Sequence, residues 1–264
     1  MKMLKQLGSI LAMLFLVPIA TWQLPFSNWE QQQGTQSKAF DEAIAFASEQ
    51  QEMTDKKVLL FATHSHEAYK PIVQKTLGQT GVYNPQENIL KLNQQLAEGL
   101  KGYGIQTDML NIDIMAEMKK TGHTFNQSYD AARAFVQEKL TFDAYDLIID
   151  LHRDAAMYDV TTLKGTENYA KVAFVVGVEH PMYDWNLAYA EQLHGKLEEL
   201  KPGISRGIIK KGGAGVDGIY NQDLAPQMLL VELGGVDNTA EELGRTLAVL
   251  SQAINELLNG TGMP

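Results

Sequence analysis

The sequence predicts an α/β domain with a mostly parallel sheet and helices on both faces. Short apolar runs alternate with longer segments whose apolar residues recur at helical spacing. Several runs are apolar at consecutive positions, which is typical of parallel strands that are buried on both faces. Three of them also end in charged or titratable residues, at the edge of the sheet where α/β proteins bind ligands.

The elements follow in chain order. The apolar runs predict strands at residues 58–62, 105–110, 146–151, 171–177, 206–210 and 227–233. One-sided apolar patterns predict helices that cover residues 89–100, 128–136, 184–200 and 239–257. Ser128 and Asp184 can cap two of these helices, and Thr239 with Glu242 matches a capping box for the last one.

The N-terminal part predicts a membrane anchor and a linker. Lys2 and Lys5 precede an apolar stretch at residues 7–22, and no A-x-A cleavage site follows. We therefore favour an uncleaved, single-pass signal anchor at residues 1–26 over a cleaved signal peptide. The lysines predict a cytoplasmic N-terminus, which would place the body of the protein outside the cytoplasm. Residues 27–56 are polar and predict a linker with a short helix around residues 38–50.

Composition limits the function classes. The chain has 264 residues, of which about 200 form one domain, at residues 57–264. Its net charge of −10 makes the chain a poor candidate for nucleic-acid binding, which needs a basic stripe. There is no cysteine, so any metal must be held by histidine, aspartate or glutamate.

Two strand ends carry candidate metal ligands. His64 and Glu67 share a face if the chain turns into a helix after the first strand. His66 is the alternative partner of His64, because residues two apart share a face if the strand continues. His152 follows the 146–151 strand. Histidine and glutamate ligands without cysteine fit a hydrolytic zinc site, which keeps one position open for water.

Glu232 interrupts the apolar run at residues 229–233. Burying an unpaired carboxylate costs several kcal/mol, so this position needs a cation, a metal or a proton. We favour a general base with a raised pKa beside the metal site. The alternative is a buried ion pair with an arginine.

The glycine-rich segment at residues 210–223 has no phosphate-binding fingerprint, and it fits a mobile flap over an active site. Residues 220–223 either face substrate or form a turn. His123 is a candidate neighbour of the site, whereas we expect His194 on a helix surface.

At these residues the chain resembles the Stage II sporulation protein P family of spore-forming bacteria, which is similar to the zinc-dependent N-acetylmuramoyl-L-alanine amidases. The resemblance covers about residues 57–255 and is carried by residues 63–69, 149–155, 205–207, 220–224, 231–235 and 238–239. The family's first motif usually reads His-Thr-His-x-Thr-Glu. Here Ala62 stands at its first histidine and His66 at its second threonine.

The resemblance implies an amidase-like or phosphorylase/hydrolase-like fold in which His64, Glu67 and His152 hold Zn²⁺. It assigns Glu232 to catalysis. Residues near these positions complete the expected site. Arg153 is expected to stabilise the oxyanion, Asp154 to fix His152 or Arg153, and Arg206, Tyr220 and Asn221 to bind substrate.

The activity that this resemblance implies is hydrolysis of the amide bond between N-acetylmuramic acid and the L-alanine of the stem peptide, with endopeptidase action on cross-links as an addition. The partners it implies are peptidoglycan, the membrane and other sporulation cell-wall proteins. Two other classes stay open: a non-catalytic wall-binding scaffold, and a zinc deacetylase or carboxypeptidase on a similar fold. A metal assay and the reaction products would distinguish them.

Overall fold

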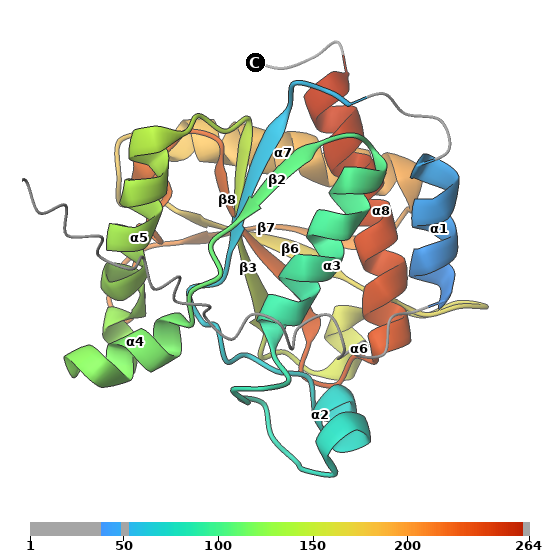
Figure 1. Ribbon diagram of the computed structural model, residues 1–264, viewed down its shortest axis with the longest axis horizontal. Coiled ribbons are helices and arrows are strands. Elements are labelled where there is room, and N and C mark those ends of the chain that lie inside the picture. The colour runs from blue at the N-terminus through green and yellow to red at the C-terminus, as the bar shows by residue number, and fades with distance from the viewer. Residues whose placement is uncertain (1–37, 49–52, 261–264) are drawn as a thin grey trace, which may run out of the picture. The chain divides into compact units, whose positions relative to one another are not determined.

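The computed structural model describes residues 38–48 and 53–260, and Figure 1 shows a central sheet with helices on both sides. Six strands form this sheet in the order β2-β1-β3-β8-β6-β7. Their bounds are β1 (Lys57–Phe61), β2 (Gln106–Met109), β3 (Leu147–Asp154), β6 (Val172–Gly177), β7 (Ser205–Lys211) and β8 (Met228–Gly235). Every neighbouring pair is parallel except β6 with β8, which confirms the predicted α/β class and the mostly parallel sheet.

The helices cover the two faces unequally. One face packs against α1 (Lys38–Ser48), α3 (Ile89–Gly102), α7 (Tyr183–Leu200) and α8 (Ala240–Asn259). The other face carries α5 (Ser128–Phe142), with α4 (Ile114–Thr121) beside it, and Figure 1 shows this pair to the left of the sheet. The shorter elements are α2 (Lys70–Leu77), η1 (Phe125–Gln127), α6 (Tyr158–Thr161), η2 (Gln222–Leu224) and the antiparallel pair β4 (Thr162–Leu163) and β5 (Tyr169–Ala170).

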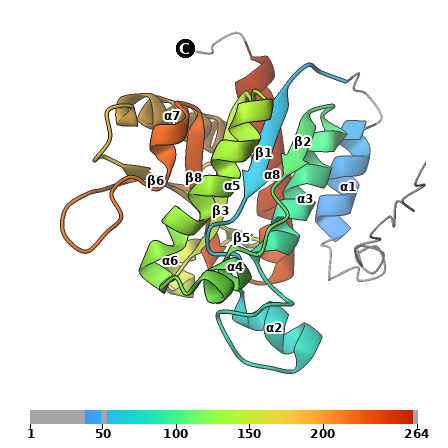
Figure 2. The same ribbon diagram turned by 60° about the vertical axis from the view of Figure 1, so that its left-hand side comes forward.

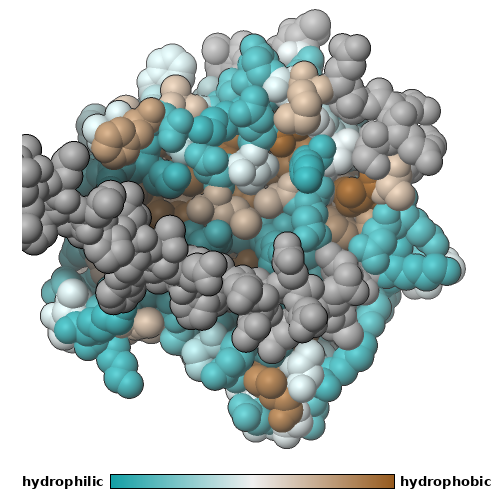
Figure 3. All heavy atoms as spheres, in the orientation of Figure 1, coloured by the Kyte–Doolittle hydropathy of each residue, from teal (hydrophilic) through white to brown (hydrophobic). Residues whose placement is uncertain are grey.

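The apolar runs are buried on both faces, as consecutive apolar residues predict. In β1, Val58 and Leu60 join the large core beneath α3 and α8, whereas Leu59 and Phe61 join a smaller core beneath α5. The outer surface is different in character. Figure 3 shows mainly hydrophilic side chains over the described part of the visible face, with smaller hydrophobic areas among them.

Helix α5 covers only part of its face of the sheet. It packs mainly over β1 and β3, whereas β6 and the middle of β8 on this side meet the segment between β7 and β8, which includes η2. Figure 2 shows this segment, in orange, projecting from the body of the domain. Tyr220 from this segment packs against Val175 and Leu230, and its ring lies edge-on to that of Tyr129 in α5. The unequal cover leaves room for a cavity between α5 and this segment.

Strand β8 contains a bulge just beyond Glu232. Its pairing with β3 shifts by one residue, from His152 opposite Glu232 to Asp154 opposite Gly235. Gly234 adopts a φ of 61°, and a Cβ atom there would lie 2.7 Å from the Asn238 side chain. Glycine is therefore required where β8 turns away from the sheet edge.

Helix α1 lies in the region that we expected to be a linker. The predicted short helix is present, and it packs against α3 and α8. Phe40 is 1% exposed and belongs to the large core. The compact unit thus includes α1. The expected anchor at residues 1–26 lies outside the described residues, and within residues 38–48 and 53–260 no helix is both long and apolar enough to cross a membrane.

If α1 is part of the folded domain, Phe40→Ala should lower the free energy of unfolding by about 3–5 kcal/mol, because it removes a buried aromatic ring. Urea denaturation followed by tryptophan fluorescence would measure this, with the exposed Glu42→Ala in the same helix as control. A loss below about 1 kcal/mol would show that α1 contributes little to the core.

Candidate active site

Three chain segments meet at one edge of the sheet because β1, β3 and β8 run parallel. The chain turns directly after β1, where the amide of Glu67 donates to the carbonyl of His64 at 2.9 Å. This turn places the His64 and Glu67 side chains on the same side. His152, in β3, lies opposite Glu232, in β8, in the strand register.

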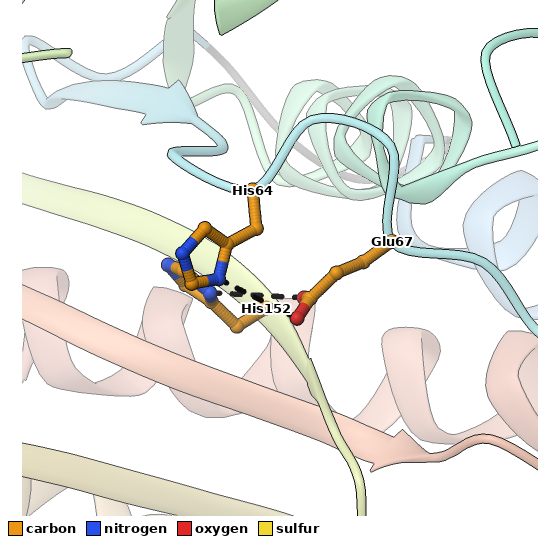
Figure 4. A group of neighbouring side chains, drawn as sticks. All are labelled: His64, Glu67 and His152. Atoms are coloured by element: carbon orange, nitrogen blue, oxygen red, sulfur yellow. Dashed lines mark ion pairs between the residues drawn. The ribbon is translucent and has the colours of Figure 1, made fainter. Parts of the chain in front are cut away.

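The side chains of His64, Glu67 and His152 converge, as Figure 4 shows. The Nδ1 atom of His64 lies 3.5 Å from one carboxylate oxygen of Glu67, and the Nδ1 atom of His152 lies 3.7 Å from the other. One ligand atom from each residue lies within 4.8 Å of the other two. No other group of three such side chains in the described residues is arranged in this way.

The Nε2 atom of each histidine, on the side of the ring away from Glu67, contacts a second polar side chain. His64 Nε2 lies 3.0 Å from the hydroxyl of Ser128, at the start of α5. His152 Nε2 lies 2.9 Å from a carboxylate oxygen of Asp150, in ion-pair contact. Asp150 also accepts hydrogen bonds from the amide and the hydroxyl of Thr63, at 2.8 and 2.7 Å. Such contacts orient metal-binding histidines and leave Nδ1 free to bind.

The sequence interpretation gave Asp150 no role, although a signal was present. Asp150 and His152 are two residues apart in a strand, so they must point to the same face. Asp154, the residue that we expected behind His152, instead forms an ion pair with Arg206 and caps the amide of Ala156 at 2.8 Å.

The electrostatics of these buried groups favour a cation. Burial lowers the pKa of His152, but the negative field of Asp150, Glu67 and Glu232 outweighs it and raises this pKa to about 9. Burial raises the pKa of Glu67, but the contact with His64 and the charges of His152 and Arg153 outweigh it and lower this pKa. The proton on His152 occupies a place that a metal ion could take. Two imidazole nitrogens and one carboxylate suit Zn²⁺.

Glu232 lies beside these groups without a partner of its own. Its buried Oε2 atom has no hydrogen-bond partner in the described part of the chain. Burial raises its pKa to about 7, with His152 opposing the shift and Glu67 adding to it. No arginine nitrogen among the described residues forms an ion pair with Glu232, so the alternative of a buried pair is not observed there. A carboxylate that titrates near neutral pH can accept and return a proton.

The three converging side chains and Glu232 line one cavity of about 660 Å³. Its walls come from α5, β3, β6, β8 and the segment after β7. The lining includes Phe125, Ser128, Tyr129, Arg153, Asp154, Val175, Lys211, Val216, Asp217, Tyr220 and Leu230. A cavity of this size is typical of ligand sites.

Of the other residues expected in the site, some line the cavity and others lie outside it. Arg153 lines the cavity, and its guanidinium donates to the carbonyls of Asp154 and Val82 at 3.0 and 3.1 Å. Tyr220 also lines the cavity. Asn221 is buried and ties the segment after β7 to α5, donating to the carbonyl of Tyr129 at 2.8 Å. Arg206 is absent from the cavity lining and pairs with Asp154.

The other histidines point elsewhere. His66 contacts Asp113, at the start of α4, at 2.8 Å. His123 is exposed beside Thr121, and neither of these histidines lines the cavity. His194 lies 2.8 Å from the hydroxyl of Ser205 at the beginning of β7. Among the candidate histidines in the described residues, only His64 and His152 come together at the site.

The aromatic wall of the cavity was missing from the sequence interpretation. Phe125 stacks on the ring of His64, with 4.7 Å between centroids. Tyr129 stacks on His152 at 6.2 Å, and its pKa is raised well above the ordinary value, mainly by burial. The 125–129 region precedes or begins a helix in the sequence, and only the tertiary fold brings it to β1 and β3.

The fold and the site define a mostly parallel α/β domain with a candidate His-Glu-His metal site at one edge of its sheet. The model of the Stage II sporulation protein P family matches residues 23–255, and the chain belongs to this family, as the resemblance predicted. It is 35% identical over 207 residues to Stage II sporulation protein P of Bacillus subtilis (strain 168), which covers 77% of this chain. The chain spans about half (51%) of the length of that relative.

Several solved structures are similar to this chain at low sequence identity. A metallo-carboxypeptidase from Burkholderia cenocepacia superposes with a TM-score of 0.45 and 11% identity, covering 76% of this chain and 57% of its own. A point mutant of murine aminoacylase 3 gives a TM-score of 0.46 and 15% identity, covering 81% and 67%. Cwp6 from Clostridium difficile gives 0.42 and 17%, covering 77% and 29%.

His64 and His66 can be separated by mutation. His64→Ala should abolish binding of one equivalent of zinc, because it removes one of three converging ligands. His66→Ala should keep most of the zinc, since its ring faces Asp113. Metal analysis of both purified variants after zinc reconstitution would measure this, and an equal loss in both would contradict the site.

Zinc binding should also depend on pH through His152. In the metal-free protein this ring is charged below about pH 9. A metal ligand must be neutral, so binding displaces the proton and apparent affinity rises by about tenfold per pH unit up to that value. Calorimetry at pH 8 in buffers of different ionisation enthalpy should show release of about one proton per zinc. Binding without proton release would contradict a role for His152.

Proposed function

We propose that this protein is a zinc-dependent peptidoglycan hydrolase that cleaves the amide bond between N-acetylmuramic acid and the L-alanine of the stem peptide. Membership of the Stage II sporulation protein P family supports the cell-wall role. The observation that carries the catalytic proposal is Glu232. It is a carboxylate with a pKa near 7, and it lines the same cavity as His64, Glu67 and His152.

The residues fit a metal-assisted hydrolysis. His64, Glu67 and His152 would hold Zn²⁺, which when bound supplies a Lewis acid that lowers the pKa of water and polarises a carbonyl. Asp150 and Ser128 fix the two imidazole rings so that both Nδ1 atoms face Glu67. Glu67 is held in turn by the amide of Arg153, which donates to its carboxylate at 2.8 Å.

Glu232 is the proton carrier in this proposal. As a carboxylate it accepts the proton of the attacking water, and as the acid it returns this proton to the leaving amine. Burial without a hydrogen-bond partner holds its pKa close to the working pH. Arg153 has its guanidinium engaged with two backbone carbonyls. The guanidinium therefore holds the Val82 segment, whereas the backbone amide of Arg153 holds Glu67, and we propose oxyanion stabilisation as a second role of the guanidinium.

Two other activities fit the same groups. A zinc carboxypeptidase or deacetylase would use the same ligands and the same general base, but it would release D-alanine or acetate. An endopeptidase that cleaves only the cross-links between stem peptides would also release no free stem peptide. A non-catalytic scaffold would have no need for Glu232, because burying a carboxylate oxygen without a partner destabilises the fold. We therefore favour a catalytic role.

We also propose that residues 1–26 anchor the protein in the membrane, with the catalytic domain outside the cytoplasm. Lys2 and Lys5 before the apolar stretch, and the missing cleavage site, support this location. The partners that we propose are peptidoglycan and other cell-wall proteins of sporulation. The acidic charge of the chain argues against nucleic acid.

Glu232→Gln tests the mechanism. Glutamine keeps the shape of the side chain but cannot accept a proton, so turnover should fall by about 10²- to 10⁴-fold. Wild-type turnover should fall below about pH 7 as Glu232 becomes protonated, or below a lower pH if a bound cation holds its charge. Release of free stem peptides from purified peptidoglycan by the full-length chain, identified by mass spectrometry, is the measurement.

Zinc content and melting temperature, measured on the same preparation, serve as controls for Glu232→Gln. A folded, zinc-loaded variant with near wild-type turnover would remove Glu232 from the mechanism. Products other than free stem peptides from the wild-type protein would redirect the proposal to a carboxypeptidase, a deacetylase or an endopeptidase.

A further inference from the structure

Two large aromatic side chains remain exposed beside the candidate metal site. Tyr83 is 50% exposed and Phe125 is 45% exposed. One face of Phe125 lies on the ring of His64, and the rings of Tyr83 and Phe125 form an edge-to-face pair, with 6.2 Å between centroids and 83° between planes. We call Tyr83 and Phe125 the aromatic rim. Exposed aromatic side chains that cluster at the edge of a cavity often mark a binding surface.

Both rings of the aromatic rim are held in place by the surrounding backbone. The segment of Tyr83 pairs with the metal-site turn, through Ala68 N to Val82 O at 2.9 Å and Asn84 N to His66 O at 2.8 Å. The guanidinium of Arg153 lies 5.6 Å from the centre of the Tyr83 ring.

On the other side of the rim, a capping box at η1, formed by Thr124 and Gln127, orders the turn that carries Phe125. Rigid aromatic rings bind with little loss of conformational entropy, so the rim is a preformed surface.

Lys211 lines the same cavity, on a strand that lies far from the aromatic rim. In the register, His152 lies level with Ala173 of β6, and Lys211 of β7 lies level with Gly177. Lys211 lies three strands away from His152 across the sheet and four residues along the strand direction. The usual strand spacings then place the two Cα atoms roughly 20 Å apart. An extended tetrapeptide spans about 14 Å, and the long, flexible side chain of Lys211 covers most of the remaining distance. The cavity floor between them contains Leu230 and Val175.

Lys211 is a cationic side chain in the lining of this cavity. No carboxylate among the described residues lies within ion-pair distance of it. The side chain of Lys210 points to the opposite face of β7, because side chains alternate along a strand. An unpaired ammonium group is suited to bind a carboxylate, and stem peptides carry free carboxylates.

Resting on the proposed function, we propose an orientation for the substrate. The sugar adjoining the scissile amide stacks its apolar face on the aromatic rim, outside the cavity, and the stem peptide lies inside the cavity with a carboxylate at Lys211. The amide bond between the sugar and the stem peptide then lies over His64, His152 and Glu232. The aromatic rim thus selects for glycan, and Lys211 selects for an acidic peptide.

Paired substrates test the aromatic rim. The probes are a disaccharide–tetrapeptide and the same tetrapeptide carrying an N-acetyl group in place of the sugars. Tyr83→Ala should raise KM for the disaccharide probe about three- to tenfold, because it removes a stacking ring. It should leave KM for the sugar-free probe within about twofold of wild type. Phe142→Ala, an exposed aromatic at the far end of α5, is the matched control.

A second pair of probes tests Lys211. Lys211→Met should raise KM about three- to fivefold for the disaccharide–tetrapeptide with free carboxylates, and should have no effect on the fully amidated form. The difference should shrink at about 1 M salt, because screening weakens an exposed ion pair. Lys210→Met, which faces away from the cavity, is the control.

Equal losses on both members of a probe pair, or losses no larger than those of the controls, would overturn the orientation. Failure of the proposed function gives a different result, because the wild-type protein would then release no stem peptide from either probe. Binding of both probes to zinc-loaded Glu232→Gln, measured by calorimetry, gives the same comparison without turnover. The same selective losses in affinity are expected there.

Discussion

The burial of ionisable side chains at one edge of the sheet is the constraint on which the site depends. Asp150 and His152 are almost inaccessible to solvent, and Glu67 is buried beside them. Removing one charge from water without compensation costs several kcal/mol, so these groups are tolerable only together. The parallel pairing of β1, β3 and β8 brings them together, because it sets three chain segments at the same level. The geometry of the candidate metal site and the electrostatic compensation of its buried charges therefore arise from one register.

The unequal cover of the sheet converts this edge into a cavity. The face under α3, α7 and α8 is filled by a continuous apolar core. On the other face α5 reaches β6 and β8 mainly through Tyr129, and the segment between β7 and β8 covers the remaining space with Tyr220. Tyr220 and Asn221 both have positive φ angles, near 55° and 58°. Asn221 binds α5, so this segment is fastened at its base while its glycine-rich part lines the cavity.

Much of the fold could be read from the sequence because buried parallel strands leave a strong apolar signal. The six strands and the helices at residues 89–100 and 239–257 follow directly from such patterns. His64, Glu67, His152 and Glu232 stood out because a polar residue at the end of an apolar run needs an explanation. The packing of α1 and the reversed direction of β6 and β7 left no local signal, since both are decided by contacts between distant segments.

The same limit applies within the site. Asp150 could have been found from its two-residue spacing to His152, but the pairing of Asp154 with Arg206 and of His66 with Asp113 depends on residues far away in the chain. Phe125 and Tyr83 look like ordinary loop aromatics in the sequence. Phe125 reaches His64 because η1 lies beside the turn after β1, and Tyr83 meets Phe125 because its segment pairs with that turn.

The most direct test of this account is a crystal structure of the zinc-loaded protein, with anomalous data collected on both sides of the zinc absorption edge. The account predicts one strong zinc peak bound by His64 Nδ1, His152 Nδ1 and a Glu67 oxygen, at roughly 2.0–2.2 Å, with Glu232 nearby but not bound. A peak that is held by His66 and Asp113, or zinc bound only at the surface, would contradict it.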